Sequence, residues 1–212
     1  MGEEERVREK NTKKLFAVIL LLTMLIPSAL AEEAAPHVLV VYLSCAGENY
    51  NVGVAREGYA SAAYAGYIEK GNTAMMAAVI ADMTGGDLFE ITTVTPYPED
   101  YASMLRVAQE EIDTDARPEL AAHVENMADY DVVFVGYPIW WYDAPMIVLT
   151  FLESYDFSGK TVIPFATSGG SPLSDSLDSV RASAAGATIG DGILANDAGD
   201  VAPWISGLGY AK

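Results

Sequence analysis

The chain has 212 residues, of which 30 are acidic and 12 are basic, so its formal net charge at pH 7 is −18. This excess of carboxylates excludes ordinary nucleic-acid binding and disfavours docking on anionic lipid heads, because phosphate groups are held by lysine and arginine. A protein partner is expected to be basic or neutral. The single cysteine, Cys45, excludes an internal disulfide, so stability must come from packing.

Residues 1–31 have the pattern of an export signal. Lys13 and Lys14 precede an apolar stretch, 15–30, and Ala29-Leu30-Ala31 has the small-x-small pattern that a signal peptidase recognises. A helix that crosses a bilayer needs roughly 20 apolar residues, so this shorter stretch makes an uncleaved anchor the weaker alternative. We expect cleavage after Ala31, no stable membrane insertion afterwards, and a mature protein that is secreted or associated with the cell surface.

The remainder, residues 32–212, suits one α/β domain, because short β-branched runs alternate with longer helical patterns. The predicted strands are 38–43, 88–91, 131–136 and 161–166, followed by a short strand within 188–194. The predicted helices are 73–83, with Asn72 or Thr73 as its cap, 100–112, 146–154, 174–184 and 201–208. The charged connector 113–127 is expected to be partly helical. This alternation predicts a parallel sheet covered by helices on both faces.

One connection is too long for a compact loop between a strand and a helix. Residues 44–70 separate the first strand from the first helix, where roughly two to six residues are usual. The segment contains four tyrosines, at 50, 59, 64 and 67, whereas disordered segments are poor in aromatic residues. Two interpretations stay open: a lid packed beside a site, or a mobile insertion.

The loop after the third strand is the most informative part of the sequence. Residues 136–145 place two of the chain's three tryptophans side by side, with Pro138 and Pro145 on either side of them. In an open parallel sheet, ligands bind where the loops leave the carboxyl ends of the strands. Pro138, Trp140, Trp141 and Tyr142 therefore predict a wall for a flat, conjugated ligand. The alternative is that these rings cap the core.

Several short motifs follow one another between residues 38 and 194. They are Val38-Leu-Val-Val-Tyr-Leu-Ser44, Gly71-Asn-Thr73, Pro96-Tyr-Pro-Glu-Asp-Tyr101, Gly136-Tyr-Pro138 with Trp140-Trp141, Phe151-Leu-Glu-Ser-Tyr-Asp-Phe-Ser-Gly-Lys160 and Pro164-Phe-Ala-Thr-Ser-Gly-Gly170. In this order and spacing they resemble the flavodoxin-like family, in particular its exported bacterial branch. The resemblance implies a three-layer α/β sandwich, a five-stranded parallel sheet in the order 2-1-3-4-5, and FMN at the carboxyl edge. The long insertion after strand one departs from the family pattern, in which a short turn joins the two halves of the phosphate loop.

The resemblance also implies which residues hold the phosphate of FMN. Ser44, Gly71, Asn72 and Thr73 correspond to the phosphate loop of flavodoxins. Backbone amides at the start of a helix carry partial positive charge and unpaired donors, which favour an anion. The alternative for 71–73 is an ordinary helix cap.

Two further segments are assigned to the flavin ring on the same basis. Pro138, Trp140, Trp141 and Tyr142 would lie beside the isoalloxazine, and Ile139 stands where relatives often have Asn, which removes a polar contact. Backbone donors of Thr167, Ser168, Gly169 and Gly170 would reach the ring's carbonyl and nitrogen atoms. The alternative for 167–170 is a plain turn before a helix.

Other chemistries lack the residues they need. His37 and His123 both precede strands, so they belong near the opposite edge of the sheet, which disfavours a Ser-His-Asp triad and a zinc site. Asp191, Asp197 and Asp200 miss the spacing of a calcium hand, and neither a G-x-G-x-x-G motif nor a Walker lysine follows strand one. Cys45 is more simply a small half-buried side chain than a redox thiol.

The leading hypothesis is therefore an FMN-binding electron carrier outside the cytoplasm, without catalytic acid–base groups, that exchanges electrons with a redox protein or a small-molecule acceptor. One alternative is an enzyme, an FMN-dependent NAD(P)H:quinone or flavin reductase, which needs an open face over the flavin. The other is a flavin-free binding module whose insertion fills the site. Because nearby carboxylates disfavour added negative charge, a carrier is expected to have a low potential for the second electron.

Overall fold

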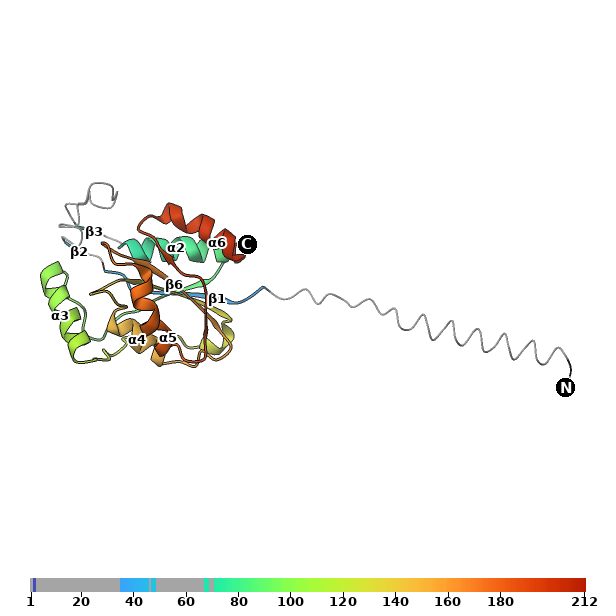
Figure 1. The fold of residues 1–212 in the computed structure, drawn as a ribbon, viewed down its shortest axis with the longest axis horizontal. Coiled ribbons are helices and arrows are strands. Elements are labelled where there is room, and N and C mark those ends of the chain that lie inside the picture. The colour runs from blue at the N-terminus through green and yellow to red at the C-terminus, as the bar shows by residue number, and fades with distance from the viewer. Residues whose placement is uncertain (1, 3–34, 46, 49–66, 69–70) are drawn as a thin grey trace. The chain divides into compact units, whose positions relative to one another are not determined.

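A computed structural model describes residue 2 and residues 35–45, 47–48, 67–68 and 71–212 (Figure 1). The predicted signal segment and most of the predicted insertion lie outside the described residues. The chain divides into two units, 1–35 and 36–212, and the helices and strands below all belong to the second. Among the described residues, none of the helices combines the length and the apolar character that crossing a membrane requires.

The central sheet is parallel, and its strands have the predicted order. β4 (Asp87–Glu90), β1 (Val38–Tyr42), β5 (Val132–Pro138), β6 (Thr161–Thr167) and β7 (Thr188–Ile189) are neighbours in that sequence, and β8 (Ile193–Leu194) also pairs with β6. Counted along the chain as five predicted strands, this order is 2-1-3-4-5. The predicted strand within 188–194 is divided into β7 and β8. Between them, Gly192 passes so close to β6 that a Cβ atom there would lie 2.4 Å from the carbonyl oxygen of Pro164.

Helices cover both faces of the sheet (Figure 1). α2 (Asn72–Thr84) and α6 (Val201–Leu208) lie on one face, and α3 (Tyr101–Asp113), α4 (Met146–Glu153) and α5 (Leu177–Ser183) lie on the other. Short 3-10 turns stand at Met127–Asp129, Leu173–Ser176 and Ala198–Asp200, and the second of these replaces the first turn of the predicted helix 174–184.

The predicted helix within the connector 113–127 is wrong. Beyond the end of α3, this segment instead runs beside the chain that leaves β4, where Leu120 forms an isolated antiparallel bridge with Thr93. Ala121 donates its N–H to the carbonyl oxygen of Thr92 at 2.8 Å. Pro118 shortly before Leu120 removes a donor and disfavours helical backbone in the residue that precedes it, so an extended segment forms.

The alternation of side chains along the inner strands builds a core on each side of the sheet. Val40 and Phe134 are fully buried against residues of α2 and α6, while Val41 and Val135 are fully buried against residues of α3, α4 and α5. Each such side chain contributes roughly 1.5 to 3 kcal/mol through burial. Because both faces are apolar, the inner strands hold their register, and the loops at their carboxyl ends start from fixed positions.

Candidate functional site

The two ends of the predicted insertion pair with each other. β2 (Gly47–Glu48) and β3 (Tyr67–Ile68) form a short antiparallel ribbon, in which Gly47 lies opposite Ile68 and Glu48 lies opposite Tyr67. This ribbon returns the chain from the carboxyl end of β1 to the start of α2. The length of the insertion therefore does not separate the two halves of the predicted phosphate loop.

The loop after β1 takes over the capping of α2. Gly71 occupies the N-cap position and offers no side-chain cap, so the prediction that Asn72 or Thr73 caps this helix is wrong. Instead, the hydroxyl oxygen of Ser44 accepts a hydrogen bond from the N–H of Ala74 at 3.2 Å. A Cβ atom at Gly71 would lie 2.4 Å from that same hydroxyl oxygen and 2.5 Å from the carbonyl oxygen of Cys45. Only glycine permits this close approach.

A pair of hydroxyl groups joins the start of α2 to the end of β6. The Oγ1 atoms of Thr73 and Thr167 lie 3.1 Å apart, and both side chains are buried. Thr167 is also linked to the loop after β5, because its carbonyl oxygen accepts the N–H of Ile139 at 2.8 Å. Pro138 pairs with Thr167 in the sheet. The three predicted segments, after β1, β5 and β6, therefore meet at one edge of the sheet.

The first turn of α2 keeps two backbone donors open. The N–H groups of Ala74 and Met75 bond to Ser44 Oγ and to the carbonyl oxygen of Gly71. Within the described residues, the N–H groups of Asn72 and Thr73 have no hydrogen-bond acceptor, as expected for the first turn of a helix. Thr73 is 2% exposed. Open donors at a half-buried and a buried residue, beside a glycine that admits close approach, fit the phosphate of FMN.

The aromatic loop after β5 is a tight turn with two rings on its outside. Trp140 and Asp143 exchange backbone hydrogen bonds, each at 3.0 Å, so Trp141 and Tyr142 are the central residues of the turn. Both have positive φ, 49° and 72°, which bulky side chains rarely adopt. Trp141 is 46% and Tyr142 is 66% exposed. These two rings are the ones available for stacking on a flat ligand.

Trp140 has a different role from the one predicted. Its indole is only 4% exposed, and its ring meets that of Tyr97 edge to face at a centroid distance of 5.1 Å. The ring belongs to the core that α3, α4 and α5 cover. Its prediction as part of the stacking wall is corrected accordingly, because a side chain with so little exposed surface has little to offer a ligand.

Three hydrogen bonds that the sequence did not indicate hold the turn in place. Asp143 accepts the N–H of Ala144 on Oδ1 and the hydroxyl of Ser179 on Oδ2, each at 2.7 Å. The indole N–H of Trp141 donates to the carbonyl oxygen of Leu105 in α3 at 3.0 Å. The aromatic turn is therefore fixed by α5 on one side and by α3 on the other.

The loop after β6 has fewer open donors than predicted. Ser168 donates its N–H to Oδ1 of Asn196, whose Nδ2 donates back to the carbonyl oxygen of Ser168. The hydroxyl of Ser168 accepts the N–H groups of Gly170 and Ser171. Among the residues predicted here, and within the described chain, only the N–H of Gly169 remains open beyond the end of the strand. Asn196, in a polar stretch near the chain's end, carried no sequence signal for this role.

The histidines lie away from this edge. His37 precedes β1, where its backbone N–H donates to Oδ2 of Asp131 at 2.8 Å, and the ring of His123 contacts that of Tyr155 beyond the end of α4. His37 is thus at the amino end of the strands, as the sequence predicts.

The fold is an α/β sandwich in which the loops after three strands meet at the carboxyl edge of the sheet. The family model for flavodoxin matches residues 61–208, and the chain belongs to the flavodoxin family. A comparison with curated proteins finds no significant match.

Solved structures resemble most of the chain. A protein assigned as a flavoprotein from Bacteroides eggerthii is 31% identical, with a TM-score of 0.63, over 82% of this chain and 98% of that one. A similarly assigned protein from Bacteroides uniformis is 32% identical, with a TM-score of 0.61, over 81% and 99%. A flavoprotein from Lactobacillus acidophilus in complex with FMN is 19% identical, with a TM-score of 0.55, over 80% and 99%. The last likeness concerns the fold alone.

Proposed function

We propose that the protein binds FMN without a covalent bond and serves as an electron carrier. The observation that carries this proposal is the meeting of Ser44, Thr73 and Thr167 at the carboxyl edge of the sheet, beside open helix-start amides. Membership in the flavodoxin family supports it, and so does the FMN complex of the Lactobacillus flavoprotein, which has the same fold. When bound, the flavin ring supplies the ability to accept and donate one or two electrons.

The roles of the residues follow from their positions. The N–H groups of Asn72 and Thr73 would hold the phosphate with neutral donors, since the residues assigned to the site include no lysine or arginine. Trp141 and Tyr142 would cover the flat ring, and the N–H of Gly169 would donate to a polar atom at its edge. Because the turn and the loop after β6 are fixed before a ligand arrives, binding costs less conformational entropy.

We favour a carrier over a reductase because of the kinds of groups that meet at the site. The residues that meet at the site offer backbone donors, hydroxyls and aromatic rings, and the described histidines lie elsewhere. We also propose that the carrier works outside the cytoplasm, on the basis of the export-signal pattern in residues 1–31. Amino-terminal sequencing of the protein from its natural host tests this second point. A mature chain that begins at Glu32 supports it. An intact start at Met1 together with recovery of the protein in the cytoplasmic fraction contradicts it, whereas an intact start in the membrane fraction indicates the uncleaved anchor.

Titration of the purified full chain with FMN and with riboflavin tests the site. Riboflavin lacks the phosphate, so we expect it to bind at least tenfold more weakly than FMN, measured by quenching of flavin fluorescence. Gly71→Ala should reduce FMN affinity strongly, because its methyl group would push Ser44 away from the start of α2. Asn72→Ala keeps the backbone donors, so it is the matched control and should change FMN affinity less than threefold.

Three outcomes would contradict the proposal. Equal affinity for FMN and riboflavin would mean that the start of α2 does not hold a phosphate. Absence of flavin binding in a folded protein, as judged by circular dichroism, would favour the flavin-free binding module instead. Rapid oxidation of NADPH by the FMN-loaded protein in the presence of a quinone would favour the reductase.

A further inference from the structure

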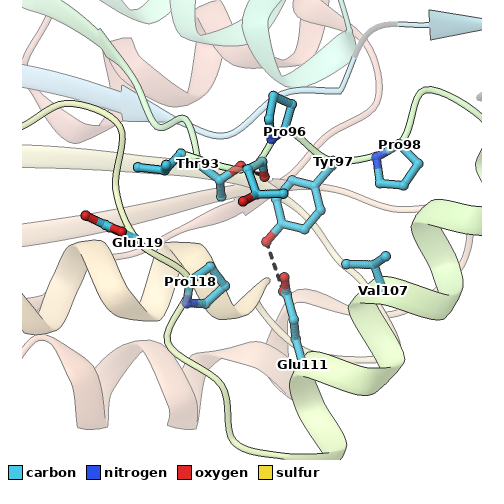
Figure 2. A pocket seen from close by; sticks show the side chains of 10 residues that line it. Thr93, Pro96, Tyr97, Pro98, Val107, Glu111, Pro118 and Glu119 are labelled. Atoms are coloured by element: carbon cyan, nitrogen blue, oxygen red, sulfur yellow. Dashed lines mark hydrogen bonds between the residues drawn. The ribbon is translucent and has the colours of Figure 1, made fainter.

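A cavity lies outside the residues assigned to FMN. It has a volume of about 310 Å³ and lies between the chain that follows β4, the inner side of α3 and the segment around residue 118 (Figure 2). Its apolar walls come from Val94, Pro96, Pro98, Val107 and Pro118. This volume lies at the lower end of the range of roughly 300 to 1,000 Å³ in which proteins hold small molecules.

Prolines and backbone hydrogen bonds constrain the walls of this cavity. Three of its residues are prolines, whose rings fix the backbone angle φ. The two sides are joined by the bridge between Thr93 and Leu120, and Val94 donates its N–H to the carbonyl oxygen of Glu119 at 3.0 Å. The cavity is therefore formed before a ligand arrives, which lowers the cost of binding.

Two polar residues, Tyr97 and Glu111, lie among the apolar residues that line the cavity. Figure 2 shows the side chains of Tyr97 and Glu111 pointing toward each other, and the Tyr97 hydroxyl donates to Oε2 of Glu111 at 2.9 Å. Oε1 of Glu111 has no partner within the described residues. A carboxylate with one occupied and one open oxygen can still accept a charged donor.

The electrostatics of the cavity favour a cation. Glu111 is half-buried, and the lining, which also includes Glu119, contains no lysine or arginine. Burial raises the pKa of Glu111, and the hydrogen bond from Tyr97 acts in the opposite direction. An ammonium or guanidinium group beside Oε1 would offset the cost of holding this charge away from water, and the ring of Tyr97 can attract the same cation.

We propose that this cavity binds a small organic cation with an apolar body, such as an arylalkylamine, with Glu111 as the residue that recognises the charge. The ammonium group donates to the open Oε1 of Glu111, and the apolar body fills the space between the prolines and Val107. The site shares no residue with the FMN site, so it does not depend on the proposed function. It nevertheless adjoins the flavin loop, since Tyr97 contacts Trp140.

Calorimetric titration of the purified full chain, without added FMN, tests this proposal with two probes of the same shape. Benzylamine is a cation at neutral pH and benzyl alcohol is neutral. We expect benzylamine to bind at least tenfold more tightly than benzyl alcohol. Glu111→Gln should remove this preference, because the amide oxygen can still accept the Tyr97 hydroxyl while the charge is lost. Glu110→Gln removes the same charge from an exposed neighbouring position on α3 and should leave both affinities unchanged.

A variant that fills the cavity distinguishes binding inside it from a general attraction to the negative charge of the protein. Val107→Phe should abolish binding of both probes by occupying the apolar space, with its folding confirmed by circular dichroism. The proposal is overturned if benzyl alcohol binds as tightly as benzylamine, or if neither probe binds the wild-type protein. It is also overturned if Glu110→Gln weakens benzylamine as much as Glu111→Gln does, since the amine would then respond only to net charge.

Discussion

At the scale of single residues, the turn formed by Trp141 and Tyr142 combines an unfavourable backbone with exposed aromatic surface. Two-residue turns with positive φ at both central positions are normally made by asparagine and glycine, because a Cβ atom is disfavoured there. Here both positions carry large rings that contribute little to the core. Strain of this kind, of the order of 1 to 3 kcal/mol per residue, persists where it serves a site.

Replacing Tyr142 separates the effect of this turn on stability from its effect on FMN binding. Tyr142→Gly removes the strained side chain and should stabilise the protein without FMN by about 1 kcal/mol, which raises the melting temperature by roughly 2 to 4 °C. The same change removes stacking surface and should weaken FMN binding by about tenfold or more. Tyr142→Ala is the control: it removes the ring but keeps a Cβ atom, so affinity should fall equally without the gain in stability. Equal melting temperatures for the Gly and Ala variants would contradict the inference that the backbone at Tyr142 is strained.

The roles of individual side chains at the site could not all be predicted from the sequence. Trp140 and Trp141 are neighbours of the same type, and the motif could not tell which ring faces a ligand. The structure separates them, because Tyr97 from the chain after β4 covers Trp140. This contact joins residues 43 positions apart in the chain, and neither residue type nor local spacing indicates it. The same holds for Asn196, which holds the loop after β6 from a distant segment.

At the scale of elements, most helices and strands could be predicted because their local sequence signals are strong. The inner strands β1, β5 and β6 are mainly apolar runs. The helix α3 has an ordinary N-cap, Asp100, whose side chain accepts the N–H of Ser103. The start of α2 is different, since its cap comes from Ser44 in another loop. A capping rule that considers only neighbouring residues therefore assigned the wrong cap.

An ion pair between elements gives the fold a predictable dependence on pH. Arg117, in the connector after α3, donates to both carboxylate oxygens of Glu153 in α4, at 2.7 and 2.9 Å. These hydrogen bonds hold the pKa of Glu153 below its usual range. A carboxyl group whose pKa is lowered by folding contributes stability above its unfolded pKa, and this contribution is lost as the pH falls through the folded pKa.

Arg117→Met should therefore destabilise the protein at neutral pH but not in acid. Because both side chains are partly exposed, the loss at pH 7 should not exceed about 1 kcal/mol. The difference from wild type should shrink as the pH falls below about 4.3, the ordinary pKa of glutamate, measured by urea unfolding. Arg181→Met, which breaks a more exposed pair with Asp178, is the control and should have little effect at any pH. A constant difference across the pH range would point to lost packing instead.

At the scale of the whole molecule, charge is the dominant property. The full sequence carries a net charge of −18, and the residues assigned to the FMN site add no positive charge to oppose it. Such a field attracts cationic partners and repels anionic ones, mainly over distances shorter than the Debye length of about 8 Å at physiological salt. Whether it acts at the site depends on which carboxylates lie near the strand ends, and Asp143 is one that the fold holds there.

Electron transfer to two small acceptors, one a cation and the other an anion, measures this field directly. The FMN-loaded protein, reduced with dithionite, should transfer electrons to the cation hexaammineruthenium(III) more slowly as ionic strength rises, because salt screens the attraction. Transfer to the anion ferricyanide should become faster, because salt screens the repulsion. Stopped-flow absorbance of the flavin gives both rates in the same buffer series. Opposite slopes would place a negative field at the point of electron exit, and hence favour a basic partner. If both rates changed in the same direction, the charge of the molecule would lie too far from the site to select a partner.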